Sequence, residues 1–191
     1  MKTLIYTNLL LVVFFLTFSV PALAQEKQSD ATWEETVDFI KSKKSYIEVK
    51  FRFYADTWRG TKSELIATSK IESLYSTSMN FKYYKKADKA VGEKANASVS
   101  ARLSFYDLKN VFDPNYGFPY SDFALRTTGE NICVSTQADN YDYSYRNCER
   151  VIGIDVEDTE MRPRILKAFK HLAYLATEYR EEQRKASGDA F

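Results

Sequence analysis

Histidine and cysteine are scarce in this chain of 191 residues, which limits the metal sites and catalytic sites that it can form. The sequence has one histidine, His171, and two cysteines, Cys133 and Cys148. Zinc sites usually take four protein or water ligands, and two cysteines with one distant histidine do not supply such a set. No serine or cysteine nucleophile lies near the histidine in the sequence, so no catalytic triad can be inferred. We therefore predict no metal site, no cofactor and no catalytic residue.

The chain also lacks an excess of charge of either sign. It has 27 Lys and Arg residues against 26 Asp and Glu residues, and loss of a leader whose one charge is Lys2 brings the basic count to 26. Proteins that bind nucleic acids normally carry a basic excess that neutralises phosphates. The composition therefore argues against a nucleic-acid partner.

Residues 1–24 contain the one long apolar run and predict a secretory signal peptide. Lys2 gives the positive start, residues 9–18 are almost wholly apolar, and Ala22-Leu23-Ala24 forms a small-x-small cleavage site. A single membrane span is the alternative, but the apolar run is shorter than the roughly 20 residues that a span needs. We expect cleavage before Gln25, a secreted or periplasmic location, and no transmembrane span after cleavage.

The remaining chain is long enough for one domain with a substantial core and short for two. A capping box at Thr32-Trp33-Glu34-Glu35 predicts a short helix over about 33–43. Asp158 or Thr159 can cap a long final helix, which we expect to fray before Gly188. We divide the chain into a signal peptide (1–24), a disordered N-terminal segment (25–31) and a single α+β domain (32–187).

Between these helices the apolar pattern has a period of two, which is typical of strands with one buried and one solvated face. Seven strands are expected, at about 47–54, 64–73, 77–83, 98–105, 122–128, 131–137 and 150–156. The final helix presents an apolar side, which we expect to cover the sheet, made of Ile165, Phe169, Leu172, Ala176 and Tyr179. The predicted fold is therefore an antiparallel sheet with a short N-terminal and a long C-terminal helix.

This order of elements resembles the pleckstrin-homology-like architecture, a curled sheet whose open corner is plugged by the last helix. The run Lys167-Ala168-Phe169-Lys170-His171-Leu172, and Phe191 after Gly188, are also similar to the ends of small uncharacterised exported bacterial proteins. The resemblance implies a fold class and no particular activity. A cone-shaped sheet that cradles helices is the alternative, although such folds usually end on strands.

The two cysteines are predicted to form a disulfide, because disulfides persist in exported proteins. The strand pattern places Cys133 opposite to the inward-facing Ile132, whereas Cys148 shares the parity of the inward-facing Ile152 and Ile154. A bulge or an irregular turn would be needed to bring both cysteines to one face. Two free structural thiols are the alternative.

Two surfaces are candidates for ligand binding. The first is basic and surrounds the turn after the first strand, with Lys50, Arg52, Trp58, Arg59 and Lys62. In phosphoinositide-binding members of the resembled architecture a basic first hairpin holds the head group, so the resemblance implies an anionic ligand, here an envelope component. The second surface consists of two aromatic loops around Tyr116 and Tyr143, since exposed tyrosines often mark binding sites. The alternative is that these tyrosines pack over the ends of the sheet.

The leading hypothesis is an exported, non-enzymatic binding or interaction domain whose ligand is a protein, a glycan or an anionic envelope component. Asp155, Glu157 and Asp158 are grouped, but they lie where acidic residues favour a helix N-terminus. His171 lies beside the apolar side of the final helix and is interpreted as a structural residue. The alternatives are a small envelope enzyme that uses carboxylates or His171, and a structural subunit of a surface assembly.

Overall fold

The chain divides into two compact units, Met1–Asp30 and Ala31–Phe191. The predicted signal peptide (1–24) lies outside the described residues, as does most of the predicted disordered segment (25–31). The computed structural model describes residues 30–56, 62–85, 97–112, 121–138 and 144–188.

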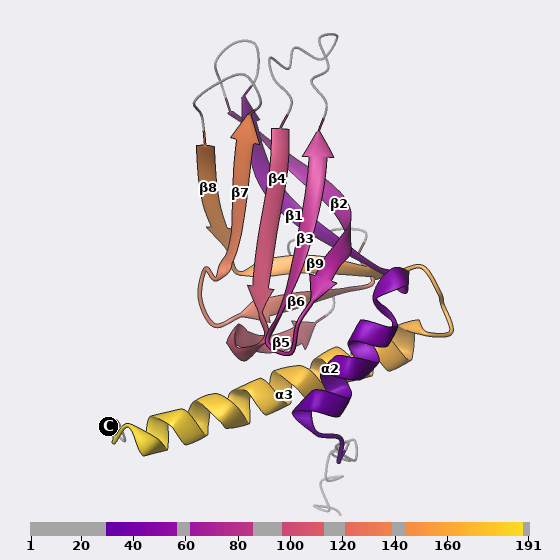
Figure 1. Cartoon of the computed structure of the whole chain (residues 1–191), viewed down its shortest axis with the longest axis vertical. Coiled ribbons are helices and arrows are strands. Elements are labelled where there is room, and N and C mark those ends of the chain that lie inside the picture. The colour runs from indigo at the N-terminus through magenta and orange to yellow at the C-terminus, as the bar shows by residue number, and fades with distance from the viewer. Residues whose placement is uncertain (1–29, 57–61, 86–96, 113–120, 139–143, 189–191) are drawn as a thin grey trace, which may run out of the picture. The chain divides into compact units, whose positions relative to one another are not determined.

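The second unit is built on one antiparallel sheet, in which the described residues form nine strands (Figure 1). The strand order is β5-β6-β9-β1-β2-β3-β4-β7-β8. The strands are β1 (Ile47–Asp56), β2 (Lys62–Leu74), β3 (Ser78–Lys85), β4 (Ala97–Ser104), β5 (Leu108–Phe112), β6 (Phe123–Thr127), β7 (Ile132–Ala138), β8 (Ser144–Glu149) and β9 (Val151–Val156).

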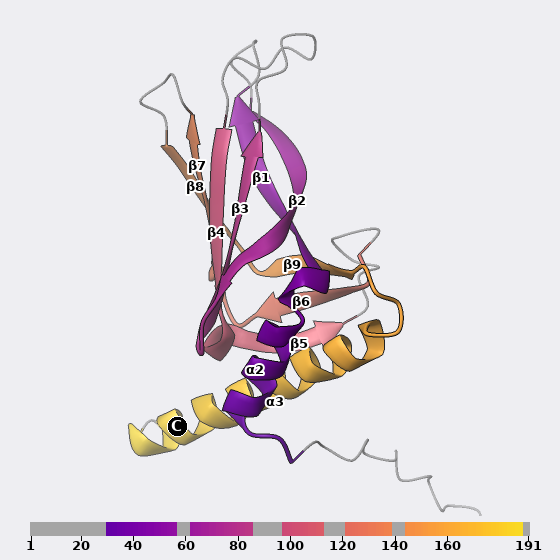
Figure 2. The same cartoon turned by 45° about the vertical axis from the view of Figure 1, so that its right-hand side comes forward.

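The sheet is curled, as the resemblance to the pleckstrin-homology-like architecture implies. The curl brings β1 into contact with β7 and β8, although β2, β3 and β4 separate β1 from them in the strand order. Figure 2 shows β9, β6 and β5 crossing below the longer strands. The inward side chains form the core, where Phe51 and Phe81 are almost fully buried and their ring centroids lie 5.0 Å apart.

The expected count of seven strands is wrong, because β5 and β8 carry weak sequence signals. β5 is only five residues long, and two of them are the exposed Lys109 and Asn110. β8 falls in a polar, tyrosine-containing stretch that is typical of a turn region, and at the sheet edge it pairs only with β7 among the described strands. Pairing with a neighbour fixes both segments where local propensity does not.

The N-terminal helix α2 (Trp33–Ser42) confirms the prediction made from its capping box. The Thr32 hydroxyl accepts a hydrogen bond from the Glu35 amide, and the Glu35 carboxylate accepts one from the Thr32 amide at 2.8 Å. These bonds lower the pKa of Glu35. Val37 and Ile40 face the core. A single 3-10 turn, η1 (Lys44–Tyr46), leads into β1.

The C-terminal helix α3 (Arg162–Ala186) runs along the β5 end of the sheet, and α2 packs against it (Figure 1). Phe169 and Leu172 are fully buried, as predicted. The helix ends at Ala186, before Gly188, and its last turns are exposed and consist largely of strong helix formers, so the expected fraying of this end stays a prediction. In the part of the chain that the structure describes, no helix combines the length and apolar character needed to cross a membrane.

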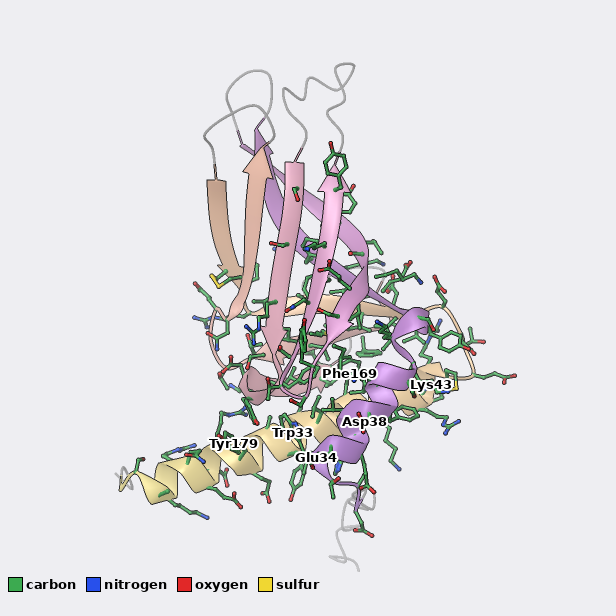
Figure 3. All side chains as sticks on the ribbon, viewed as in Figure 1. Trp33, Glu34, Asp38, Lys43, Phe169 and Tyr179 are labelled. Atoms are coloured by element: carbon green, nitrogen blue, oxygen red, sulfur yellow. A yellow bond between two sulfur atoms is a disulfide. The ribbon has the colours of Figure 1, made fainter. Side chains whose placement is uncertain are left out.

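Three aromatic rings connect α2 and α3 through the 3-10 turn η2 (Phe105–Asp107). The ring of Tyr106 lies 4.8 Å from that of Trp33 and 4.5 Å from that of Tyr179, both stacked. Figure 3 labels Trp33 on α2 and Tyr179 on α3. Tyr179 therefore contacts another aromatic residue and stays 40% exposed, whereas the sequence pattern predicts that it covers the sheet.

The predicted disulfide between Cys133 and Cys148 is confirmed (Figure 3). The two cysteines are direct cross-strand partners on β7 and β8, with Cα atoms 4.0 Å apart. The parity objection fails because Cys148 belongs to β8 and not to β9. A bend at Arg150 separates these strands, so the inward parity of Ile152 does not extend back to the cysteine.

Candidate binding groove

An open groove of about 640 Å³ lies over the strands β2, β3, β4 and β7. The groove includes Phe81 and Ala101, which are buried, and otherwise mostly polar side chains. On β3 and β4 the polar residues of the groove occupy alternate strand positions, which share one face of a sheet. This is the outer face, because the intervening positions on β3 and β4, such as Met79 and Leu103, are buried in the core. The lining residues are Glu72, Ser73, Tyr75, Asn80, Phe81, Lys82, Ser100, Ala101, Arg102 and Cys133.

Strand register places four of these residues in one row across the groove. Asn80 pairs with Ser73 of β2 on one side and with Arg102 of β4 on the other. Arg102 in turn pairs with Cys133 of β7. Directly opposed residues in antiparallel strands point to the same face with close Cβ atoms, so the four side chains form a continuous row.

A register shift in β2 brings Ser73 into this row. Ile71 pairs with the inward-facing Phe81, and two residues later Ser73 pairs with Asn80, so the regular alternation is broken between them. Such bulges redirect a side chain and bend the strand. The Asn80 side-chain amide donates a hydrogen bond to Ser73 Oγ at 3.3 Å. Its other polar atom, Oδ1, is buried and has no hydrogen-bond partner among the described residues.

The two cations of the groove differ in their electrostatic surroundings. Lys82 Nζ lies 3.0 Å from a Glu72 carboxylate oxygen, so its charge is balanced. Arg102 is exposed, and no described residue forms an ion pair with it. A guanidinium in this position can offer a planar pair of N–H donors to a carboxylate, phosphate or sulfate group.

The cations on the β1 side of the sheet are balanced by acidic residues. Lys50 Nζ lies 2.6 Å from Asp155 Oδ2. Lys70 contacts both Glu48, at 3.4 Å, and Glu157. Desolvation by burial would lower the pKa of Lys70, but hydrogen bonds to Glu157 and Glu48 outweigh it and raise that pKa. Both lysines therefore contribute less positive potential than their number suggests.

The structure describes three residues of the basic surface that the sequence predicts, Lys50, Arg52 and Lys62. Lys50 and Arg52 occupy alternate positions of β1, and Lys50 forms the ion pair with Asp155. Trp58 and Arg59 lie outside the described residues. Lys62 begins β2, opposite Asp56 of β1. The basic surface around Trp58 therefore stays a prediction.

The predicted aromatic surface around Tyr116 and Tyr143 lies outside the described residues. Of the predicted residues that the structure describes, the groove includes Cys133 alone. Sequence reasoning missed Arg102, Asn80 and Tyr75. The sequence indicated only that Asn80 and Arg102 lie on the polar faces of two predicted strands. That they are neighbours depends on the pairing of β3 with β4.

The residues considered for catalysis have structural contacts. His171 is 8% exposed, and its Nε2 lies 2.7 Å from the Ala31 carbonyl oxygen, so it joins α3 to the segment before α2. Asp158 Oδ1 accepts hydrogen bonds from the Glu160 and Met161 amides just before α3. Among the described residues no cluster of three His, Cys, Asp or Glu side chains could hold a metal ion.

No family model matches the chain, and no similar protein was found among curated proteins or solved structures. The groove must therefore be interpreted from its own geometry.

Proposed function

We propose that this protein is an exported, non-enzymatic binding domain whose outer-face groove receives a ligand with an anionic group and several hydroxyls, such as an acidic glycan. The observation that carries the proposal is Arg102, an exposed guanidinium without an ionic partner among the described residues, beside an Asn80 amide with an unsatisfied acceptor. A buried acceptor without a donor costs free energy that a ligand hydroxyl can recover.

Each side chain of the groove has a role in this proposal. Arg102 binds the anionic group through charge-assisted hydrogen bonds. Asn80, Ser73 and Ser100 exchange hydrogen bonds with hydroxyls, since amides and hydroxyls both donate and accept. Tyr75 is 56% exposed at the end of β2 and offers a flat apolar surface to a sugar ring. Ser73, Asn80, Ser100 and Arg102 stand on strands, which hold a site more precisely than loops do.

The leader pattern and the disulfide support export, because disulfides are retained in oxidising compartments. The resemblance to pleckstrin-homology-like domains supports a binding role as an analogy of fold only. His171 lies on α3 and does not line the groove, so we assign it no chemistry.

The proposal is tested by titrating ¹⁵N-labelled protein with tetragalacturonate, an acidic oligosaccharide, and with neutral maltotetraose. The acidic sugar should shift the amide signals of β3 and β4 around Asn80 and Arg102. Arg102→Gln should weaken binding about 10- to 100-fold, as expected for lost hydrogen bonds to a charged group. Arg184→Gln, an exposed arginine of α3, is the matched control and should leave affinity unchanged.

Two results would contradict this assignment. The first is a pattern of shifts confined to residues outside the groove, with the two arginine variants equal in affinity. The second is the absence of any shift with either sugar at millimolar concentration. A partner bound through the surface around Lys50 and Arg52 would instead support the basic surface predicted from the sequence.

A further inference from the structure

Between Lys167 and Glu181, the solvent-facing side of α3 carries basic residues before Tyr174 and acidic residues after it, and the basic Arg184 and Lys185 follow in the last turn. Lys167 and Lys170 lie in the N-terminal half, Glu178 and Glu181 in the C-terminal half, and Tyr174 lies between them. All five side chains are exposed, and Tyr174 keeps 40% of its surface in solvent. The buried side of α3, which contains Phe169, faces the sheet instead.

The spacing of these five residues is symmetric about Tyr174. Successive members are three, four, four and three positions apart, and residues three or four apart lie on one side of an α-helix. With a rise of about 1.5 Å per residue, Lys167 and Glu181 each lie roughly 10 Å from Tyr174 along the axis. Reversing the helix direction about Tyr174 therefore exchanges the basic half with the acidic half.

Contacts within the chain do not account for this arrangement. In the part of the chain that the structure describes, none of the four charged residues takes part in an ion pair. Among these four residues the nearest lysine and glutamate, Lys170 and Glu178, are eight positions apart, beyond the three- or four-residue spacing of intrahelical pairs. Glu181 lies four positions before Lys185, but no ion pair joins these two described residues. The Tyr174 hydroxyl bonds to Glu178, which raises the pKa of the tyrosine.

We propose that this side of α3 binds the same side of a second copy of the chain, with the two helices antiparallel. A two-fold axis perpendicular to the helices at Tyr174 places Lys167 and Lys170 of each copy over Glu178 and Glu181 of the other. Such a contact is isologous, because the same surface serves both copies. The two Tyr174 rings meet at the axis and supply aromatic contact area at its centre.

The contact consists mainly of exposed ion pairs, which contribute little individually and are screened by salt. The dimer is therefore reversible and is favoured by high protein concentration and low ionic strength. It does not depend on the groove, since α3 contributes no lining residue.

A charge-exchange experiment tests the proposal on the purified protein by sedimentation equilibrium. In one variant Lys167→Glu and Lys170→Glu make all four charged positions acidic, and in the other Glu178→Lys and Glu181→Lys make all four basic. Each variant alone should be monomeric at concentrations where the unchanged protein is half dimeric. An equimolar mixture should recover the dimer, because every contact then joins opposite charges. Raising the salt from about 0.02 to 0.5 M should dissociate both dimers.

Two controls separate this contact from general charge effects. Glu34→Lys with Asp38→Lys makes the same change on exposed positions of α2 and should leave dimerisation unaltered. Tyr174→Cys should form a disulfide-linked dimer under mild oxidation, since it alone of the five faces its own copy, whereas Lys167→Cys should not. A wild-type monomer at low salt, a mixture that stays monomeric, or equal crosslinking of both cysteine variants overturns the proposal.

Discussion

Removing the disulfide tests both the fold and the support of the groove. Cys133 and Cys148 are 15 positions apart and join the edge strand β8 to β7. On the chain-entropy model, closing a loop of about this length stabilises the folded state by roughly 3 kcal/mol. A domain of ordinary stability has about 5 to 15 kcal/mol in total. The double change Cys133→Ala and Cys148→Ala, which leaves no free thiol, should therefore remove a large part of the stability without preventing folding.

Urea unfolding measures this loss directly. For a slope of about 1 to 3 kcal/mol per molar urea, the midpoint should fall by about 1 to 3 M while the slope changes little. Hydrogen exchange should show β8 losing protection before β3 or β4, because β8 has a single neighbour among the described strands. An unchanged midpoint, or two alkylatable thiols in the native protein without reductant, would refute the reasoning.

Three further predictions concern two aromatic side chains, a helix cap and the leader. Phe169→Ala should lower the free energy of unfolding by about 3 to 5 kcal/mol in a urea titration, since the ring is fully buried, whereas Tyr179→Ala should cost roughly 0.5 to 1.5 kcal/mol, the value of an aromatic pair. In a series of unfolding experiments at different pH, Glu35→Gln should be less stable than the wild type near neutral pH and equal to it in acid. The pKa of Glu35 is lower in the folded than in the unfolded state, so ionised Glu35 stabilises the fold above its unfolded-state pKa, and this stabilisation is lost as the pH falls through its folded-state pKa. N-terminal sequencing of the exported protein should begin at Gln25, and an intact chain in the membrane would contradict cleavage.

Much of the fold could be predicted because each clear strand alternates in sequence. Phe51 and Phe81 lie in runs with period two, and both are buried. Tyr145 and Cys148 belong to a strand whose sequence is mostly polar, so periodicity gave no signal for β8. The same omission caused the incorrect parity argument about Cys148. Edge strands are difficult in this respect, because one neighbour defines them and their own composition does not.

The site was less accessible to sequence reasoning, since it depends on which distant residues pair. Lys50 was predicted to carry a ligand, but Asp155 of β9 neutralises much of its charge. Arg102 looked like any solvated residue of an alternating strand, and only the register of β4 with β3 places it beside Asn80. The shift in β2 that adds Ser73 has no sequence marker such as glycine or proline.

Arg102 and the outer side of α3 have one property in common: the described residues leave their charges without ionic partners. Exposed ion pairs stabilise a fold very little, so the stability of the fold hardly depends on whether these charges have ionic partners. What distinguishes these two places is geometry, in one case a groove with hydrogen-bonding neighbours and in the other a symmetric spacing. Because they stand on different elements and share no contact partner, changes at the two should be additive. Arg102→Gln should leave the dimer intact, and the charge-exchange variants of α3 should bind tetragalacturonate as the wild type does. Strong coupling between them would mean that one of the two surfaces has been assigned incorrectly.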